Sequence, residues 1–300
     1  MNNFDCIIIG SGISGITAAI YLKRANKNVL LLESNMPGGQ INKTSNVENY
    51  PGFSKIDGPS LAMNLLDQVE HLEINLKYEE VINIEKDGNF KIETSKATYE
   101  APYVVLATGR IPNLLGLENE AELIGKGISF CALCDGNFYK NLDVVVVGGG
   151  DSAFEESLYL SSICKSITII NRSDKLRASN ILQEQVSKKD NIKVVYNEAI
   201  SKINTEEGKI VSVNLKNSTL PCNGIFVYIG STPNLSYLKN LDIATENNYV
   251  VVDSSMKTNI DGLYAAGDVV KKNTYQIVTA AADGAKAASA IIKNMEWFYV

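Results

Sequence analysis

The same strand, glycine-rich turn, helix and strand pattern occurs twice in this chain of 300 residues. The first turn, Gly10-Ser11-Gly12-Ile13-Ser14-Gly15, follows the apolar segment Phe4 to Ile9, and the second, Gly148-Gly149-Gly150-Asp151-Ser152-Ala153, follows Val144 to Val147. Such turns let the backbone approach a pyrophosphate, whose charge is met by the N-terminus of the following helix. One such turn is a weak signal, but two in the same context predict an α/β protein with two Rossmann-like dinucleotide-binding domains.

The two copies differ at the position expected to contact a ribose. Glu33 and Asn171 stand at the same offset from the first glycine of their turns, and Asn171 is followed by Arg172 and later by Arg177. A carboxylate accepts hydrogen bonds from free ribose hydroxyls and repels a 2′-phosphate, whereas arginine attracts that phosphate. The sequence therefore predicts FAD at the first turn and NADP at the second. The alternative for the two arginines is a solvated, charged helix start.

The segment Cys131-Ala132-Leu133-Cys134-Asp135 is the one place where two of the five cysteines stand close together. A Cys-x-x-Cys loop can form a redox disulfide, and the adjacent Asp135 is placed to exchange a proton with a sulfur. Half a zinc site is a weaker interpretation, because zinc takes four ligands, the other cysteines are scattered and His71 is the only histidine. Two inert cysteines are the other alternative. No metal is predicted, and a dithiol with dinucleotide sites indicates electron transfer to or from disulfides.

Composition excludes several classes of function. The formal net charge of −6 argues against nucleic acid, and no apolar run is long enough to span a membrane. No basic region of a signal peptide is visible at the N-terminus, and an odd number of unpaired cysteines fits a reducing cytoplasm. A cytoplasmic protein is therefore expected. With one histidine, proton transfer must use a carboxylate, thiol, tyrosine, lysine or cofactor.

Over essentially its whole length the chain resembles the low-molecular-weight bacterial thioredoxin reductases, a branch of the FAD- and NAD(P)-binding flavin disulfide reductases. Besides the two glycine turns and the cysteine segment, the matching motifs are Gly38-Gly39-Gln40, Val47 to Gly52, Ala107-Thr108-Gly109 and Ala266-Gly267-Asp268. The resemblance implies an FAD site made by Gly10, Ser11, Gly12, Ile13, Ser14, Gly15, Glu33, Gly39, Gln40, Asn49, Thr108, Gly109, Gly267, Asp268, Gln276 and Ile277. It implies an NADPH site made by Gly148, Gly150, Asp151, Ser152, Arg172 and Arg177.

The resemblance also implies an organisation and a reaction. Residues 1–112 and 242–300 would form the FAD-binding domain, and residues 113–241 an inserted NADP-binding domain that carries the redox disulfide. The implied reaction passes electrons from NADPH through FAD to the Cys131–Cys134 disulfide and on to thioredoxin or a thioredoxin-like protein. Cys134 would lie against the flavin, Cys131 would attack the substrate and Asp135 would carry the proton. A homodimer and a large domain rotation are implied as well.

The chain departs from the family pattern at the second ribose position. The family usually has a His-Arg-Arg-x-x-x-Arg run, whereas this chain has Asn171-Arg172-Ser173-Asp174-Lys175-Leu176-Arg177. A reductase of the same fold fed by ferredoxin therefore stays open, as do a flavin-dependent dithiol oxidase and a non-catalytic redox-sensing flavoprotein. The aromatic tail, Trp297-Phe298-Tyr299-Val300, is expected to pack against the last helix.

Overall fold

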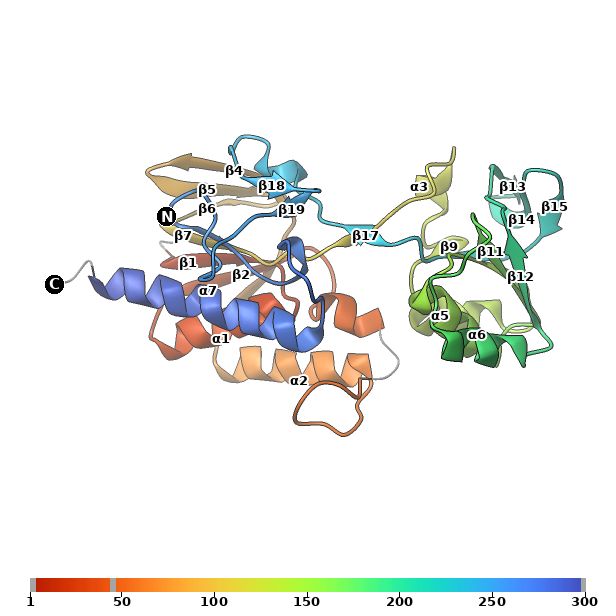
Figure 1. The fold of residues 1–300 in the computed structure, drawn as a ribbon. Coiled ribbons are helices and arrows are strands. Elements are labelled where there is room, and N and C mark those ends of the chain that lie inside the picture. Colours follow the sequence, from red (N-terminus) through yellow and green to blue (C-terminus); the bar gives the residue numbers. More distant parts are fainter. Residues whose placement is uncertain (1–3, 44–46, 298–300) are drawn as a thin grey trace. The chain divides into compact units, whose positions relative to one another are not determined.

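The computed structural model describes residues 4–43 and 47–297, which divide into two units (Figure 1). Unit 1 lies within Met1–Ile111 and Thr232–Val300, and unit 2 is Pro112–Ser231. The chain passes between them through β8 (Ile111–Pro112) and β17 (Ser231–Thr232), which pair with each other. The second boundary between the units therefore falls after residue 231, whereas the resemblance implied a boundary after residue 241. The reason is η3 (Ser236–Leu238), whose buried Tyr237 and Leu238 pack in the core of unit 1.

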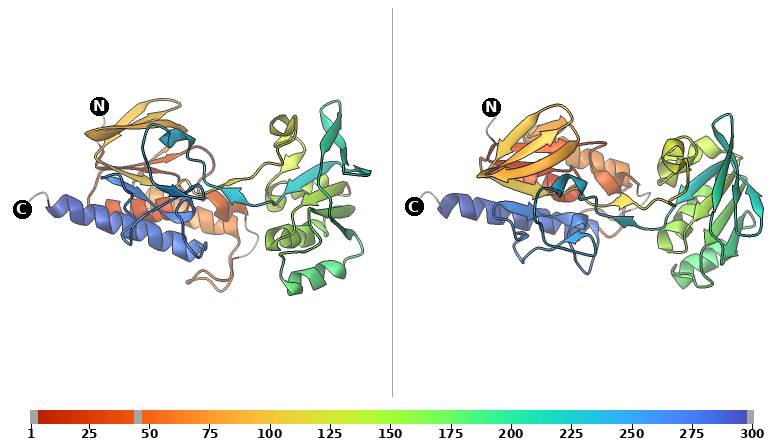
Figure 2. Two further views of the ribbon diagram at one scale, coloured as in Figure 1. Left: turned by 45° about the horizontal axis from the view of Figure 1, so that its top comes forward. Right: turned by 90° about the horizontal axis from the view of Figure 1, so that it is seen from above.

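Unit 1 is built on a parallel sheet of five strands in the order β20-β7-β1-β2-β3. These strands are β1 (Cys6–Ile9), β2 (Val29–Glu33), β3 (Asn75–Tyr78), β7 (Tyr103–Leu106) and β20 (Leu263–Ala265). One face carries α1 (Ile13–Arg24), α2 (Gly58–His71) and α7 (Ile277–Trp297). The other carries the antiparallel strands β4 (Val81–Asp87), β5 (Asn89–Thr94) and β6 (Thr98–Ala101), as Figures 1 and 2 show.

Alternation along β1 explains this layering. Cys6 and Ile8 pack with the helices, whereas Ile7 and Ile9 pack with the three-stranded sheet, because successive side chains of a strand point to opposite faces. Both sets are apolar, so β1 is buried on both sides, as expected of a central parallel strand. The smaller elements of unit 1 are η1 (Gly39–Lys43), β18 (Thr245–Glu246), β19 (Tyr249–Val250) and η4 (Gly267–Val269).

Unit 2 repeats the architecture with a parallel sheet in the order β12-β11-β10-β16-β9. Its strands are β9 (Ile128–Ser129), β10 (Asp143–Val147), β11 (Ser166–Asn171), β12 (Ile192–Tyr196) and β16 (Gly224–Val227). The helical segments are α3 (Glu120–Leu123), α4 (Ala132–Asp135), η2 (Gly136–Tyr139), α5 (Asp151–Leu160) and α6 (Asn180–Ser187). An antiparallel sheet is formed by β13 (Lys202–Glu206), β14 (Lys209–Asn214) and β15 (Thr219–Pro221).

The predicted fold class is confirmed. Each glycine turn joins a central parallel strand to a helix, as β1-α1-β2 in unit 1 and β10-α5-β11 in unit 2, and unit 2 is inserted within the sequence of unit 1. Among the described helices, none is both long and apolar enough to cross a membrane. The prediction for the aromatic tail concerns the side chain of Trp297 and residues 298–300, which lie outside the described part of the chain.

Candidate active site

The redox segment lies at the carboxyl end of β9 in unit 2. Because β9, β16 and β10 run parallel as neighbours, the segments that follow them emerge at the same edge of the sheet. Cys131 follows β9, Tyr228 follows β16, and the second glycine turn follows β10. The topology of unit 2 therefore brings the two cysteines and a dinucleotide-type turn to one edge.

Cys131 and Cys134 form a disulfide at the first turn of α4. Sγ of Cys131 accepts a hydrogen bond of 3.1 Å from the backbone N–H of Cys134, as the capping residue of that helix. After reduction, the same N–H would stabilise a thiolate on Cys131. The two sulfurs differ in access, because Cys131 is buried and Cys134 is exposed.

Asp135 is held by a residue that the sequence analysis missed. The hydroxyl of buried Ser129 donates to Oδ2 of Asp135 at 2.6 Å, and its oxygen accepts the backbone N–H of Cys131 at 3.0 Å. Ser129 thus fixes the carboxylate relative to the backbone of the first cysteine. The available signal was a hydroxyl residue two positions before that cysteine.

Two further titratable groups lie behind the dithiol. The hydroxyl of Tyr228 accepts the backbone N–H of Ala132 at 2.9 Å, and burial raises the pKa of Tyr228 far above its ordinary range, so the phenol stays protonated. On α5, burial and the neighbouring Glu155 raise the pKa of Glu156 to about 7. Glu156 is therefore partly protonated near neutral pH, although sequence reasoning gave it no role.

The three remaining cysteines have no part in this site. Cys6, Cys164 and Cys222 are buried free thiols. Burial raises the pKa of Cys164 to about 11 and that of Cys222 to about 12, and it raises the pKa of Cys6 still further. Because the thiolate is the reactive form, these thiols do not compete with the Cys131–Cys134 pair.

The glycine turns fit phosphate groups. Gly12 and Gly150 are the N-caps of α1 and α5, and a Cβ added to either would meet no heavy atom within 4 Å. Space is therefore open beside the N-terminus of both helices, the part of a helix that binds a pyrophosphate. At Gly15, a Cβ would come within 1.9 Å of the carbonyl oxygen of Gly10, so the helix packs closely on its strand, as the glycine pattern requires.

The two ribose positions are organised differently. In unit 1, Oε2 of buried Glu33 accepts hydrogen bonds from the backbone and hydroxyl of Ser11 at 2.8 and 2.7 Å. In unit 2, the buried Asn171 amide donates to the carbonyl oxygens of its own loop, whereas Arg172 and Arg177 are exposed. A 2′-phosphate is therefore accessible to the arginines and not to Asn171.

The other residues of the second turn serve the local structure as well. Asp151 and Ser152 begin α5 and are exposed, and Oδ1 of Asp151 accepts the backbone N–H of Ser179 at 2.7 Å. This contact fixes the segment before α6 beside the turn.

The remaining predicted FAD residues come together in unit 1 through side-chain contacts. Nε2 of Gln40 donates to the carbonyl oxygen of Arg110 at 3.0 Å, and Nδ2 of Asn49 donates to Oε1 of Gln276 at 3.0 Å. The hydroxyl of Thr108, which precedes Gly109, hydrogen-bonds that of Tyr237 at 2.8 Å.

The start of η4 packs against the first glycine turn. A Cβ on Gly267 would come within 2.4 Å of Oγ of Ser14, and one on Gly39 within 3.5 Å of Gly12. Ile13 is buried and begins α1, and Ile277 begins α7. Gly39 and Gly267, which precedes Asp268, therefore lie against the same turn as Gly12.

Charged residues that the sequence analysis missed surround Asp268. A guanidinium nitrogen of Arg110 lies 2.9 Å from Oδ2 of Asp268, and the guanidinium lies 4.6 Å from the ring centre of Tyr275. Lys272 bonds Asp283 at 2.8 Å and stands 3.7 Å from Asp268. Arg110 directly follows the Ala107-Thr108-Gly109 motif, and Lys272, Tyr275 and Asp283 lie after Ala266-Gly267-Asp268, where no local pattern marks them.

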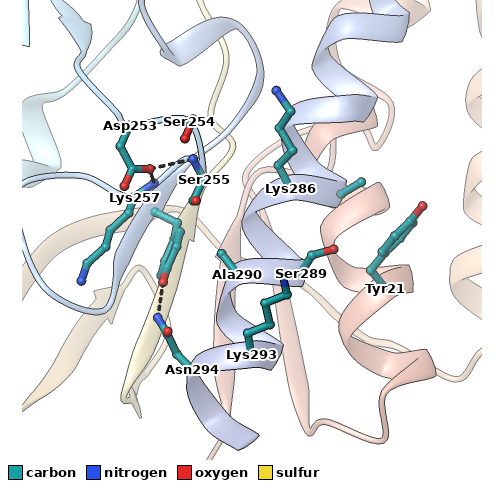
Figure 3. Close-up of a pocket in the computed structure, with 12 residues that line it drawn as sticks. Tyr21, Asp253, Ser254, Ser255, Lys257, Lys286, Ser289, Ala290, Lys293 and Asn294 are labelled. Carbon is teal, nitrogen blue, oxygen red and sulfur yellow. Dashed lines mark hydrogen bonds between the residues drawn. The ribbon is translucent and has the colours of Figure 1, made fainter. Parts of the chain in front are cut away.

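A separate groove of about 550 Å³ lies on unit 1 between α7 and the segment 253–257 (Figure 3). Lys257, Lys286 and Lys293 line it, and the carboxylate of Asp253 is engaged by the backbone of Ser255 and Lys257. None of the residues predicted for catalysis or cofactor binding lines this groove. It is therefore not the candidate active site.

Two dinucleotide-type turns and a redox disulfide on two Rossmann-like units are the parts of a disulfide oxidoreductase. The sequence profile of the pyridine nucleotide-disulphide oxidoreductases matches residues 4–285. The thioredoxin reductase of Listeria innocua is 41% identical over 98% of this chain and 94% of its own length, and that of Bacillus subtilis is 38% identical over 98% and 95%. The crystal structure of Lactococcus lactis thioredoxin reductase superposes with a TM-score of 0.89 at 40% identity, covering 97% of this chain and 98% of its own.

The chain therefore belongs to the pyridine nucleotide-disulphide oxidoreductase family, among its low-molecular-weight thioredoxin reductases, which confirms the resemblance. Membership implies FAD and NADPH as cofactors. The two open glycine cradles fit both dinucleotides, and the exposed Arg172 and Arg177 fit the 2′-phosphate of NADPH.

Proposed function

We propose that this protein is a thioredoxin reductase that passes electrons from NADPH through FAD to the Cys131–Cys134 disulfide and on to thioredoxin or a thioredoxin-like protein. The observation that carries the proposal is that disulfide, with Asp135 fixed by Ser129, at the same sheet edge as a dinucleotide-type turn. When bound, FAD supplies a group that accepts a hydride and delivers two electrons. Unit 1 is proposed to bind FAD and unit 2 to bind NADPH.

The residues of unit 2 are assigned as follows. After reduction, Asp135 accepts the proton of the Cys131 thiol, and the resulting thiolate, stabilised by the N–H of Cys134, attacks the substrate disulfide and forms a mixed disulfide. Asp135 passes that proton to the leaving thiolate. Cys134 then gives up its own proton and attacks Sγ of Cys131, which closes the enzyme disulfide, and the second substrate sulfur leaves as a thiol with that proton. Cys134 is also the sulfur proposed to face the flavin. Because Cys134 is exposed in unit 2 and Cys131 is buried, burial does not choose between the two roles, and their assignment rests on the family resemblance.

The proposal divides the work between the units. The dithiol and the NADPH turn both belong to unit 2, whereas the FAD residues belong to unit 1. NADPH, the electron donor, and the dithiol, the electron acceptor, must therefore reach the flavin one after the other. We propose that a rotation of the units allows this.

The test is an anaerobic titration of the purified flavoprotein with NADPH, NADH and reduced ferredoxin, followed by addition of oxidised thioredoxin. We expect NADPH to bleach the flavin absorbance and thioredoxin to restore it. Bleaching by ferredoxin alone would favour the ferredoxin-fed reductase. Oxygen consumption with small dithiols and no response to NADPH would favour the dithiol oxidase, and reversible oxidation without turnover would favour the redox sensor.

Arg172→Ala is expected to raise the KM for NADPH about 10- to 100-fold and to change the KM for NADH little. The reason is that a hydrogen bond to a charged group contributes about 1.5–3 kcal/mol, and this one exists only with the 2′-phosphate. Steady-state kinetics with both nicotinamides measure the effect. Lys202→Ala, which removes an exposed cation of β13 in the same unit, is the control. Equal effects on NADPH and NADH would contradict the assignment.

Phe138→Ala is expected to lower kcat/KM for thioredoxin roughly tenfold, a typical cost of removing an aromatic anchor from a protein interface. Phe138 follows the redox segment in η2 and is 79% exposed, which puts an aromatic residue, of the kind enriched at protein interfaces, next to the dithiol. Reduction of a small aromatic disulfide should be unchanged. Ile181→Ala, an equally isolated apolar residue of α6 that is 70% exposed, is the control. Loss of both activities in Phe138→Ala would point to local unfolding.

The proposal includes a cytoplasmic homodimer. The three free thiols support a reducing compartment, in which cysteines remain unpaired. The dimer follows from the resemblance alone, and light scattering after size exclusion tests it. Ferredoxin is retained as the alternative electron donor and not as a partner of the main proposal.

A further inference from the structure

Asn171 is a buried polar residue at the end of β11 to which the proposed reaction gives no role. Its Nδ2 donates to the carbonyl oxygen of Ser173 at 2.8 Å, to the hydroxyl oxygen of Ser173 at 3.3 Å and to the carbonyl oxygen of Lys175 at 3.0 Å. The hydroxyl of Ser173 donates to the same carbonyl oxygen of Lys175 at 2.9 Å. One side chain therefore holds the backbone of the turn that follows β11.

The other end of the amide lies against the second glycine turn. A Cβ added to Gly149 would come within 2.2 Å of Oδ1 of Asn171, so the absence of a side chain at position 149 leaves room for the amide. The acceptors around Nδ2 fix which end of the amide is which, because a reversed amide would place its oxygen against the carbonyl oxygens of Ser173 and Lys175. Asn171 thus fills the space between the glycine turn and the turn after β11.

The segment that follows Asn171 is also bonded to the glycine turn at its far end. The carbonyl oxygen of Gly149 accepts the backbone N–H of Arg177 at 2.6 Å and that of Ala178 at 3.0 Å. Arg172 and Arg177 therefore belong to a backbone that is held beside the turn at both ends, and their side chains are exposed. Ordering long side chains around a ligand costs entropy, and a fixed backbone reduces that cost.

The equivalent residue of unit 1 uses its side chain in the opposite sense. Glu33 accepts hydrogen bonds from Ser11, the counterpart of Gly149, and from the backbone N–H of Asn35 at 2.8 Å. Its carboxylate is an acceptor at the ribose position and would repel a 2′-phosphate. Asn171 carries no charge, and its amide donates to the segment that bears the two arginines.

We infer that Asn171 is a specificity-determining residue for NADPH, which acts by positioning the segment that carries Arg172 and Arg177 and not by contacting the 2′-phosphate itself. The inference rests on the proposed NADPH site of unit 2. Without the amide, the segment would adopt further conformations, and the affinity for a 2′-phosphate would fall with the fraction of molecules in which both arginines are in place. NADH lacks this phosphate, so its binding should not respond.

A matched pair of substitutions separates nucleotide selectivity from general stability. Asn171→Leu is nearly the same size and removes every hydrogen bond of the amide. The control is Asn191→Leu at the opposite edge of the same sheet, because Nδ2 of Asn191 also donates to two carbonyl oxygens, those of Ser161 at 2.9 Å and Cys164 at 3.3 Å. Asn171→Ala removes the same bonds as Asn171→Leu without its bulk, and it decides the question if the leucine variant does not fold.

Binding and turnover are measured on the full-length oxidised flavoprotein. Calorimetry gives the Kd of adenosine 2′,5′-bisphosphate and of AMP, which differ only in the 2′-phosphate, and steady-state kinetics give kcat and the KM for NADPH and NADH. We expect Asn171→Leu to raise the Kd of the bisphosphate and the KM for NADPH about tenfold, the effect of losing one or two net hydrogen bonds. The Kd of AMP, the KM for NADH and kcat at saturating NADPH should not change, and Asn191→Leu should change none of these quantities.

An unchanged preference for the 2′-phosphate in the Asn171 variants, or equal losses with NADPH and NADH, would overturn the inference and leave Asn171 as a structural residue of its turn. If the wild-type protein prefers the bisphosphate to AMP and the variants keep that preference, only this inference fails. If the wild-type protein binds the bisphosphate and AMP equally and NADPH does not bleach its flavin, the proposed function fails with it.

Discussion

Replacing either Cys131 or Cys134 with serine is expected to abolish thioredoxin reduction, with a loss on the order of 10³-fold or more, as for other covalent nucleophiles. The electrons have no alternative sulfur to use, because Cys6, Cys164 and Cys222 are buried and burial raises the pKa of each thiol. FAD content should be unchanged, since the residues proposed to bind FAD lie in unit 1 and the dithiol in unit 2. The readouts are NADPH consumption with oxidised thioredoxin and the ratio of flavin to protein absorbance.

The two serine variants should differ in what they trap. Cys134→Ser keeps Cys131, so a mixed disulfide with thioredoxin forms and no second sulfur resolves it. Cys131→Ser should trap none. Because Cys134 is exposed and Cys131 is buried, a mixed disulfide trapped by Cys131→Ser would also be chemically reasonable, and the experiment distinguishes the two assignments. Trapping by Cys131→Ser alone would assign the attack to Cys134, and non-reducing gels with mass spectrometry decide between them. Cys222→Ser is the control. Normal turnover with thioredoxin in either active-site variant would show that electrons do not pass through the Cys131–Cys134 dithiol.

The elements and turns of this protein were predictable because their signals are local. An apolar strand, a glycine turn and a helix are written in consecutive residues, and the two residues that form the disulfide are three positions apart. The chemistry around these elements was less predictable. Arg110 and Asp268 are 158 positions apart, and Tyr228 and Ala132 are 96 apart, so no local pattern joins them. Contacts between side chains that are distant in sequence form only on folding, and they produce no local pattern from which they could be predicted.

The second domain boundary illustrates the same limit. Tyr237 and Leu238 are apolar residues that either unit could have buried, and nothing in their sequence chooses between the two cores. The structure packs them with Val250 and Leu263 in unit 1, and the hydroxyl of Tyr237 bonds Thr108. The boundary was therefore set by packing between distant segments and not by a linker composition.

The sequence also did not predict which of the two cysteines, Cys131 or Cys134, is buried. The motif places two sulfurs in one loop, but it does not say which of them faces the sheet. That choice depends on β9 pairing with β16 and on the bond between Ala132 and Tyr228. Ala132, which bonds Tyr228, is buried, and Cys134, two residues later, is exposed.

Asp135→Asn is expected to slow reoxidation of the reduced enzyme by thioredoxin about 10²- to 10⁴-fold, the usual contribution of a positioned proton donor. The thiolate that leaves during exchange needs a proton, and Asp135 is the carboxylate fixed beside the cysteines by the 2.6 Å bond from Ser129. Asparagine keeps the shape and can still accept that bond, so flavin content and folding should not change. Stopped-flow recovery of flavin absorbance after mixing the reduced enzyme with oxidised thioredoxin measures the rate.

Ser129→Ala tests the positioning of the acid, because it leaves the Asp135 carboxylate in place but removes the bonds that Ser129 makes to that carboxylate and to the backbone of Cys131. We expect a smaller loss, about tenfold, since one hydrogen bond to a charged group contributes about 1.5–3 kcal/mol and the acid itself remains. Asp190→Asn, at an exposed carboxylate of the same unit, should have no effect. If Asp135→Asn reoxidises at the wild-type rate throughout about pH 6–9, Asp135 has no part in proton transfer, and its bond to Ser129 serves only to hold the end of α4 on β9.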